Sequence, residues 1–296
     1  QKMATYSIKD MEKLSGIKAH TIRIWEKRYS LICPSRTNTN IRLYSDAELR
    51  KLLNISILVR NGMRISQISR LPDSVLGEKV AILAQTTSKI EDLSEGLISA
   101  MIEFDENKFD RILSNLIIKF GFEDTYIKVL TPFFEKVGIL WQTGTILPAQ
   151  EHFVSSLIRQ KLIIAIDSQR DVPITRKSNF LLFLPEGEMH ELGLLFIQYL
   201  LRKRGYSTVY LGQNVPMDNF PGLSEKLSVD VLVTSFTLSS VRVNAEKIVR
   251  NILLSFPHTK VILTGLQIKN FSFQKTHNVH CYSHVHDFIQ AIEVFD

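Results

Sequence analysis

The sequence predicts a multidomain protein built from three parts of different fold: a small basic helical unit, an all-helical bundle and a doubly wound α/β domain. Three observations support this division. Positive charge is concentrated in residues 1–72, apolar residues recur at helical spacing through residues 73–170, and short apolar runs alternate with helical patterns in residues 178–296. A chain of 296 residues is long enough for two or three domains.

The composition is that of a water-soluble globular protein, with 45% hydrophobic and 22% charged residues. No apolar run is long enough to span a membrane, and the amino end lacks the core of a signal peptide, so we expect a cytoplasmic protein with no membrane partner. Cys33 and Cys281 fall in different predicted domains, which gives no basis for a disulfide framework or a thiolate metal site.

The charge is unevenly distributed along the chain. Residues 1–72 contain six Lys and eight Arg against two Asp and three Glu, a net charge of +9, and the remainder carries −3 of the total of +6. Such asymmetry indicates a polyanionic partner for the amino-terminal unit, most simply DNA. The alternative, a basic face that is only solvated, needs no partner.

The amino-terminal unit begins with two short helices. Residues 7–17 predict a helix that Ser7 caps and that ends at a turn with Gly16. A second helix is predicted over residues 18–29. At 100° per residue, one of its faces is apolar and packs inward, with Ile22, Trp25 and Tyr29.

The opposite face of this second helix is basic and exposed, with His20, Arg23 and Lys27 on it and Ile24 at its edge. Two helices joined by a short turn, the second exposing basic side chains, form a helix-turn-helix. Its second helix would enter the major groove of DNA. We therefore expect His20, Arg23 and Lys27 to contact double-stranded promoter DNA.

Residues 32–44 are rich in turn formers and lead to Ser45-Asp46, a helix-capping pair, which suits a β-wing beside the groove. The order of helix, turn, basic helix, wing and capped helix resembles the winged-helix domain of MerR-family regulators. The motifs that carry the resemblance are IRIWEKRY at residues 22–29, Pro34-x-Arg36 and Arg42-Leu43-Tyr44-Ser45. Asn40 replaces the usual wing glycine and tolerates the same left-handed backbone.

This resemblance places Arg36, Arg42 and Tyr44 at the wing and the DNA phosphates, whereas an ordinary surface charge remains the alternative for each arginine. Residues 45–59 and 63–71 are expected to complete the domain as two helices, with a break at Asn61-Gly62. Pro72-Asp73 is expected to start a linker.

The middle segment, residues 73–170, predicts a bundle of four or five helices. Apolar residues recur at helical spacing, as in Ile90, Leu93, Leu97 and Met101, and Asp105 and Pro132 punctuate the series. The segment contains neither a glycine-rich phosphate loop nor the spacing of a catalytic triad.

The α/β domain starts with a buried strand at residues 179–185, a polar loop, and a helix at residues 194–204. Glu188 and His190 lie in that loop, at the carboxyl end of the strand, where open α/β sheets bind ligands. A carboxylate two residues before a histidine can hold one imidazole nitrogen while the other ligates a metal. A capping or solvated histidine is the alternative on these residues alone.

The segment Glu188-Met189-His190-Glu191-Leu192-Gly193 resembles the Asp-x-His-x-x-Gly motif of cobalamin-binding domains. By that resemblance His190 would be the lower axial ligand of cobalt, Glu188 would orient it in place of the usual Asp, and Gly193 would leave room for the nucleotide tail.

Further strands are predicted at residues 207–212, 230–234, 260–263 and 279–282, with helices at 218–227, 242–256 and 287–295. The expected strand order is flavodoxin-like, as in other cobalamin domains. Hydroxyls that follow the third strand, those of Ser235 and Thr237 among them, suit hydrogen bonds to a cofactor tail, and Gly265 lies at the end of the fourth strand. Thr264 precedes it where the family commonly has glycine, which narrows the tail pocket. His277, His280, His284 and His286 do not form a defensible ligand set.

Trp141 lies ten residues before Glu151-His152, a spacing that resembles light-responsive, cobalamin-dependent MerR-type repressors of the CarH/LitR group. In that group the bundle covers the upper face of the corrin, so Trp141, Glu151 and His152 would contact the adenosyl group. A core Trp and a Glu in the first turn of a helix are the alternative. Gln142 stands where some members have a second histidine ligand, which puts a bis-histidine photoproduct in doubt.

The three parts occur in the order found in the CarH/LitR group, which implies a transcriptional repressor and photoreceptor that binds adenosylcobalamin or another cobalamin and forms a homo-oligomer, a dimer or a tetramer. The alternative is a MerR-type regulator whose sensor has lost cobalamin and responds to a protein or another small molecule. A cobalamin-dependent methyltransferase or mutase would need a substrate-binding barrel, for which no segment is left, so we do not expect an enzyme.

Overall fold

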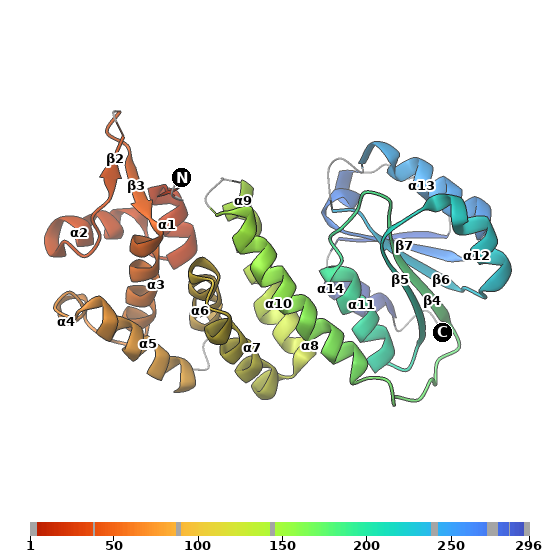
Figure 1. Cartoon of the computed structure of the whole chain (residues 1–296), viewed down its shortest axis with the longest axis horizontal. Coiled ribbons are helices and arrows are strands. Elements are labelled where there is room, and N and C mark those ends of the chain that lie inside the picture. The colour runs from red at the N-terminus through yellow and green to blue at the C-terminus, as the bar shows by residue number, and fades with distance from the viewer. Residues whose placement is uncertain are drawn as a thin grey trace. The chain divides into compact units, whose positions relative to one another are not determined.

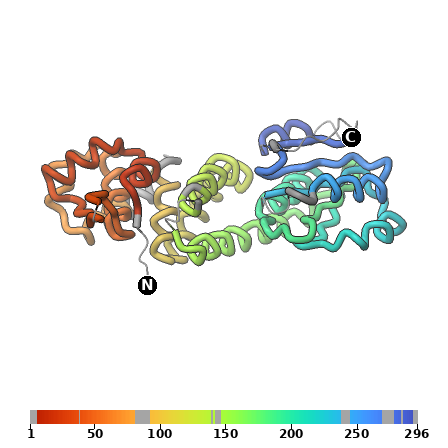
Figure 2. Tube along the Cα trace, turned by 90° about the horizontal axis from the view of Figure 1, so that it is seen from above, coloured from red at the N-terminus to blue at the C-terminus, as the bar shows by residue number. Residues whose placement is uncertain are grey.

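The computed structural model describes residues 5–37, 39–86, 90–142, 146–237, 242–270, 278–283 and 285–292. The chain divides into two compact units, Gln1–Leu157 and Ile158–Asp296, whereas the sequence predicted three domains. Figure 2 follows the chain through both units, from the red amino-terminal helices to the blue carboxyl-terminal helix. None of the described helices is long and apolar enough to cross a membrane.

The first unit opens with the two predicted helices, α1 (Ile8–Ser15) and α2 (Ala19–Tyr29). Ser7 caps α1 in a reciprocal arrangement with Asp10, and Gly16 ends it in the left-handed conformation with a φ of 69°. The predicted cap and turn are therefore confirmed.

The wing is a small antiparallel sheet with the order β1-β3-β2, formed by Thr5–Tyr6, Ser35–Arg36 and Arg42–Ser45 as β1, β2 and β3. The β2–β3 hairpin projects beside α2 (Figure 1). Asn40 has a φ of 63°, the left-handed conformation expected for the residue in place of the usual glycine. The winged helix-turn-helix is confirmed.

Helix α3 (Asp46–Arg60) begins at the predicted cap, Ser45, which shares a capping box with Glu48. The next helix, α4 (Ile65–Ile68), is shorter than predicted. Helix α5 (Asp73–Thr86) starts at Asp73, so the linker expected there is absent. Asp73 lies in the first turn of that helix, where a carboxylate interacts favourably with the helix dipole.

The bundle consists of α6 (Ile90–Glu103), α7 (Glu106–Phe120), α8 (Phe122–Thr125), a π-helical turn (Tyr126–Leu130), α9 (Thr131–Gln142) and α10 (Pro148–Asp167). Asp105 caps α7 by accepting a hydrogen bond from the Lys108 amide at 2.9 Å. Pro132 lies directly after the π-helical turn, and the backbone stays helical from Phe122 to Gln142. Asp105 therefore begins a new helix as predicted, whereas Pro132 does not interrupt the helical backbone.

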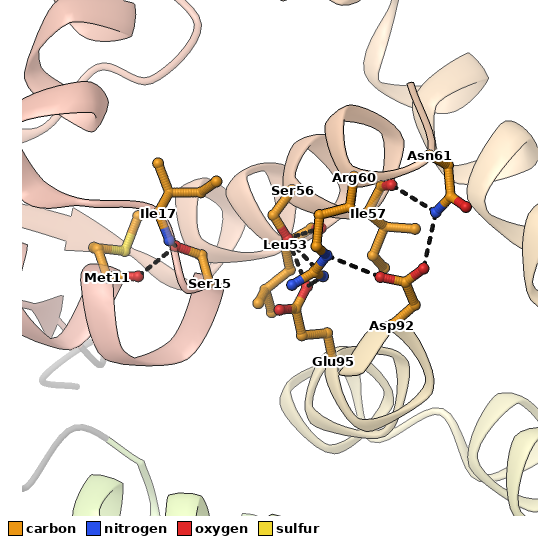
Figure 3. A network of polar contacts seen from close by, with 10 residues as sticks. All are labelled: Met11, Ser15, Ile17, Leu53, Ser56, Ile57, Arg60, Asn61, Asp92 and Glu95. Atoms are coloured by element: carbon orange, nitrogen blue, oxygen red, sulfur yellow. Dashed lines mark hydrogen bonds and ion pairs between the residues drawn. The ribbon is translucent and has the colours of Figure 1, made fainter. Parts of the chain in front are cut away.

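A buried polar network joins α3 to α6 (Figure 3). The Arg60 guanidinium lies 2.9 Å from Asp92 and 2.6 Å from Glu95, and the side chains of these two acids are 1% and 2% exposed. Ser56 Oγ lies 2.5 Å from Glu95, and the Asn61 amide donates to Asp92 at 2.8 Å. Burying two carboxylates is tolerable only because each has a charged partner and a second hydrogen bond.

The second unit contains a five-stranded parallel sheet with the order β5-β4-β6-β7-β8. Counted along the chain, this is the flavodoxin-like order 2-1-3-4-5, so the predicted fold is confirmed. The first of these strands along the chain, Asn179–Pro185, lies inside the sheet and is buried along nearly its whole length, which explains its continuous apolar sequence. The strands are β4 (Asn179–Pro185), β5 (Ser207–Val215), β6 (Val231–Ser235), β7 (Lys260–Thr264) and β8 (Val279–Tyr282).

Helices cover both faces of this sheet (Figure 1). On one face, α12 (Phe220–Lys226) and α13 (Arg242–Ser255) pack on Leu181, Leu232 and Val261 in one apolar cluster. The other face carries α11 (Leu192–Lys203) and α14 (Val285–Ile292), and Tyr206 donates a hydrogen bond to the Ile292 carbonyl at 2.9 Å. Because β4, β6 and β7 are adjacent and parallel, their carboxyl ends lie at the same edge of the sheet.

Replacing Arg60 by Met is expected to lower the free energy of unfolding by about 3 kcal/mol near neutral pH, because it leaves two buried carboxylates without a cation. This value is the lower end of the usual range for removing one partner of a buried ion pair, and we take it because the Arg60 side chain is 30% exposed. Burial already raises the pKa of Glu95, and the hydrogen bond from Arg60 opposes that rise. Urea unfolding at several pH values measures the effect.

The pH dependence has a defined sign. An acid whose pKa is raised in the folded state stabilises the protein when protonated and loses that contribution as pH rises through the folded pKa. Arg60→Met raises the pKa of Glu95 further, so its deficit is expected to be larger at pH 8 than at pH 5. The double variant Arg60→Met, Glu95→Gln is the control and should recover part of the loss; an equal deficit at both pH values would contradict the assignment.

Candidate functional site

The second helix of the winged domain separates its side chains as predicted. Ile22 and Trp25 are 0% and 8% exposed and belong to the core. His20, Arg23 and Lys27 are exposed, and the burial pattern thus gives α2 one packed face and one basic face. Arg28, which the sequence analysis did not select, is also exposed, and its guanidinium lies 5.5 Å from the centre of the Tyr29 ring.

The expected role of Tyr44 at the DNA backbone is wrong, because its side chain is 0% exposed. Its hydroxyl points to Glu26, at 3.5 Å, and burial raises the pKa of Tyr44 to about 12. Glu26 also pairs with Arg42 at 3.0 Å, which leaves the Arg42 side chain 29% exposed. Arg42 and Tyr44 thus hold β3 against α2. A phosphate contact by Arg42 stays a prediction.

Arg36 is the wing cation that the structure leaves at the surface. Its guanidinium donates to the Asn40 side chain at 2.6 Å, across the hairpin. Asn40 therefore does more than accept a left-handed backbone, since its amide oxygen also orients Arg36. The sequence showed the first role of Asn40 and gave no signal for the second.

In the second unit, Glu188 and His190 lie together in the loop after β4. Nδ1 of His190 is 2.7 Å from Oε1 of Glu188, and the His190 side chain is 50% exposed whereas that of Glu188 is 0% exposed. The same carboxylate oxygen accepts the amides of Met189 and His190, each at 3.0 Å. Its other oxygen accepts the amide of Thr237, after β6, at 2.7 Å. The Glu188 carboxylate thereby joins the two loops and fixes the orientation of the His190 ring.

The end of β5 holds the same loop from its other side. Asn214 accepts the Gly187 amide at 2.8 Å, and Gln213 donates to the Met189 carbonyl at 2.6 Å. Asn214 has a φ of 54°, a left-handed conformation that a non-glycine residue rarely adopts. Such strain persists where surrounding contacts determine it, and here those contacts fix the histidine loop.

Glu191, directly after His190, is a second buried carboxylate that the sequence analysis did not select. Its side chain is 6% exposed and forms an ion pair with Arg159 of α10. Tyr210 of β5 donates to its other oxygen at 2.6 Å, and burial raises the pKa of Tyr210 well above its usual range. The only local signal was the carboxylate beside His190, because its two partners lie far away in the sequence.

Three residues predicted for a cofactor tail lie at the ends of β6 and β7. Ser235 is 6% exposed, and the Thr237 carbonyl accepts the side chain of Gln267 at 3.4 Å. Gly265 has a φ of 99°, and a Cβ there would lie 2.4 Å from the Phe236 carbonyl oxygen, so only glycine fits. In addition, the buried Thr234 hydroxyl has no hydrogen-bond partner among the described residues.

Gly193 lies in the first turn of α11, and a Cβ built there would meet no atom of the described residues within 4 Å outside its own part of the helix. The structure therefore brings Glu188, His190, Ser235, Thr237 and Gly265 to one edge of the sheet and leaves open space beside Gly193. Thr264 turns its hydroxyl to the Thr234 carbonyl, at 3.3 Å. Of the four further histidines, His277 and His284 lie outside the described residues.

The three residues expected above the cofactor belong to the bundle. Trp141, in the last turn of α9, is 57% exposed, which excludes the alternative of a core tryptophan within this unit. Glu151 is in the first turn of α10, and its carboxylate lies 3.3 Å from Nδ1 of His152, whose side chain is 78% exposed. Gln142 ends α9, and its side chain lies outside the described part of the chain.

Two family models match this architecture. Residues 6–74 match the MerR HTH family regulatory protein, and residues 93–165 match the B12 binding domain. The first match covers the winged helix-turn-helix, and the second covers the helices that carry Trp141, Glu151 and His152. The chain thus combines a MerR helix-turn-helix with a B12-binding domain, the arrangement of a cobalamin-binding transcriptional regulator of MerR type.

Curated relatives of the same type extend this result. The chain is 29% identical over 221 residues to the HTH-type transcriptional repressor CarH of Myxococcus xanthus, with 73% of each chain covered. It is 24% identical over 264 residues to the repressor CarA of the same organism, covering 88% of this chain and 87% of CarA. The predicted relationship to CarH-type regulators is confirmed. These relatives are transcriptional regulators and not enzymes, as expected for this chain.

A solved structure shows the same fold. The monomethylamine corrinoid protein of Methanosarcina barkeri has a TM-score of 0.57 to this chain at 14% identity, covering 70% of this chain and 99% of the other. At this identity the likeness concerns the fold alone.

Replacing Tyr210 by Phe is expected to loosen the histidine loop, because the buried Glu191 carboxylate loses one of its two side-chain partners. A hydrogen bond to a charged group contributes about 1.5–3 kcal/mol, so amide exchange in residues 186–191 should become roughly 10- to 100-fold faster. Hydrogen–deuterium exchange measured by mass spectrometry checks this. Tyr282→Phe is the control, since the described residues offer its hydroxyl no partner; equal exchange in both variants would refute the role of Tyr210.

Proposed function

We propose that this protein is a DNA-binding transcriptional repressor controlled by adenosylcobalamin and by light. His190 is the lower ligand of cobalt in this proposal, and Trp141, Glu151 and His152 contact the upper side of the cofactor. The winged helix-turn-helix binds promoter DNA through His20, Arg23, Lys27 and Arg36.

The observation that carries the proposal is the pair formed by Glu188 and His190. A half-exposed imidazole whose Nδ1 is held by a fully buried carboxylate is the arrangement of a metal-ligating histidine with its orienting partner. One imidazole is enough for a cobalt ion that already has four nitrogen ligands from a corrin ring. Glutamate replaces the usual aspartate of the motif, and its three backbone amide donors fix the longer side chain.

The residues beyond this pair also fit a cobalamin. The open space beside Gly193 suits the nucleotide tail, and the glycine required at position 265 lets the ends of β6 and β7 approach closely. Thr234 has a buried hydroxyl without a partner in the described chain, which a polar tail would satisfy. Thr264 directs its hydroxyl to the Thr234 carbonyl, so its polar group is already satisfied within the sheet.

On the upper side, the exposed indole of Trp141 and the adjoining Glu151-His152 pair offer one apolar surface and two polar groups to an adenosyl ligand. When bound, the cofactor would supply a cobalt–carbon bond that light can cleave. The bundle residues would sense whether the upper ligand is present.

Control of DNA binding requires linkage between the two sites. The cofactor can change DNA affinity only if it binds the DNA-binding assembly better than the alternative state. We propose that the loaded protein forms a homo-oligomer, a dimer or a tetramer, whose paired winged domains bind DNA together. Loss of the upper ligand would favour the dissociated, weakly binding state.

The His190→Ala variant is expected to lose the coloured complex that the wild-type protein forms with adenosylcobalamin in the dark, because the cobalt loses its protein ligand. Gel filtration with absorption detection measures the complex. His286→Ala is the matched control, since His286 is an exposed histidine that contacts Gln290 on α14. A stable coloured complex of His190→Ala would contradict the ligand assignment.

The same samples test control by light. A duplex selected from a random library by the loaded wild-type protein should be retarded in the dark and released after illumination, with a change in the absorption spectrum. Retardation that is unaffected by cofactor and light would instead support the alternative, a MerR-type regulator whose sensor no longer uses cobalamin.

The Glu188→Gln variant is expected to bind cobalamin about 10- to 100-fold more weakly, the usual effect of removing the partner of a ligating histidine. One amide oxygen cannot accept all the donors that the carboxylate accepts, so either His190 or the Thr237 amide loses its partner. Titration followed by absorption measures the affinity. Glu186→Gln, an exposed change in the same loop, should have wild-type affinity. Wild-type binding by Glu188→Gln would show that the carboxylate does not orient the ligand.

A further inference from the structure

The basic face of α2 contains one large apolar side chain. Ile24 is 52% exposed, although the adjacent Ile22 and Trp25 are buried. It is not part of the core. The helix therefore presents an isoleucine to solvent at a position where any polar residue would be compatible with the fold.

The neighbours of Ile24 show which surface it belongs to. His20 precedes it by four residues, and Lys27 and Arg28 follow it by three and four, so these side chains lie beside it on the helix surface. All three are exposed. Ile24 thus lies among basic side chains of α2, on the face that a helix-turn-helix places in the major groove.

The major groove offers one prominent apolar group, the C5-methyl group of thymine, and side chains that contact it are apolar. Cations at neighbouring positions bind phosphates or guanine, and none of them can detect a methyl group. We propose that Ile24 is a specificity-determining residue that recognises thymine by packing on its methyl group. This inference rests on the proposed DNA binding of the winged domain.

The test replaces thymine by deoxyuridine, which removes the methyl group and leaves every hydrogen-bonding group of the base in place. A duplex is selected from a random library by the wild-type protein, and each thymine of the selected site is replaced in turn. At one thymine in each half-site the wild-type affinity is expected to fall about fourfold, the effect of removing one methyl group from an apolar contact.

Ile24→Ala should bind the selected duplex more weakly and should no longer distinguish thymine from deoxyuridine at that position. Ile24→Val, which keeps part of the side chain, should retain part of the discrimination. Ile118→Ala is the matched control: Ile118 is 83% exposed on α7, outside the winged domain, and its loss should leave the fourfold discrimination unchanged. Fluorescence anisotropy with the cofactor-loaded proteins measures the affinity of all four for the thymine and the deoxyuridine duplex.

The outcomes separate the two levels of the proposal. If no duplex is selected, the proposed DNA binding fails. If the wild-type protein binds a selected duplex but no deoxyuridine substitution weakens binding, the role of Ile24 is overturned. It is also overturned if Ile24→Ala discriminates as well as the wild type, because another side chain would then contact the methyl group. Since Ile24 contributes nothing to the core, circular dichroism should show that its variants are folded.

Discussion

The arrangement of the histidine loop depends on one buried carboxylate, that of Glu188. An isolated charge with no exposed surface would be very unfavourable, and three backbone amides and one imidazole make it tolerable here. One of these amides belongs to Thr237, at the end of a different strand. The position of His190 is therefore set by the sheet, because the carboxylate that holds it can be satisfied only when the ends of β4 and β6 are correctly aligned.

Glu191 adds a second constraint on the opposite side of the histidine. Its carboxylate joins the loop to α10 through Arg159 and to β5 through Tyr210. His190 thus lies between two buried carboxylates that face different elements. A displacement of the imidazole would strain contacts to β6 on one side and to α10 on the other. Arg159 lies in the part of α10 that belongs to the same compact unit as the histidine loop.

Local signals in the sequence predicted the helices and strands. They could not predict the side-chain roles that depend on partners far away in the sequence. The Ser7 and Ser45 caps, the helix break at Asp105 and the buried strand β4 follow from capping and periodicity, and all are observed. The flavodoxin-like order, also observed, was expected from the resemblance to cobalamin-binding domains. Tyr44 was misassigned because an Arg-x-Tyr motif reveals nothing of Glu26, eighteen residues earlier, which turns the hydroxyl inward. The side-chain partners of Glu191 and the carboxylate partners of Arg60 lie more than fifteen residues away and left no local pattern.

The same internal pairing changes how the charge of the winged domain should be understood. Its net charge of +9 indicated a polyanionic partner, yet several of its cations have carboxylate partners within the protein: Arg42 pairs with Glu26, Arg60 with Asp92 and Glu95, and Lys51 with Asp73. Arg60 and Lys51, both on α3, pair with carboxylates beyond residue 72. Part of the excess positive charge therefore forms ion pairs between α3 and the helices that follow it. The cations that remain on α2 and the wing form a smaller set. Since each phosphate contact adds to the salt dependence of binding, that dependence should reflect this smaller set and not the total charge.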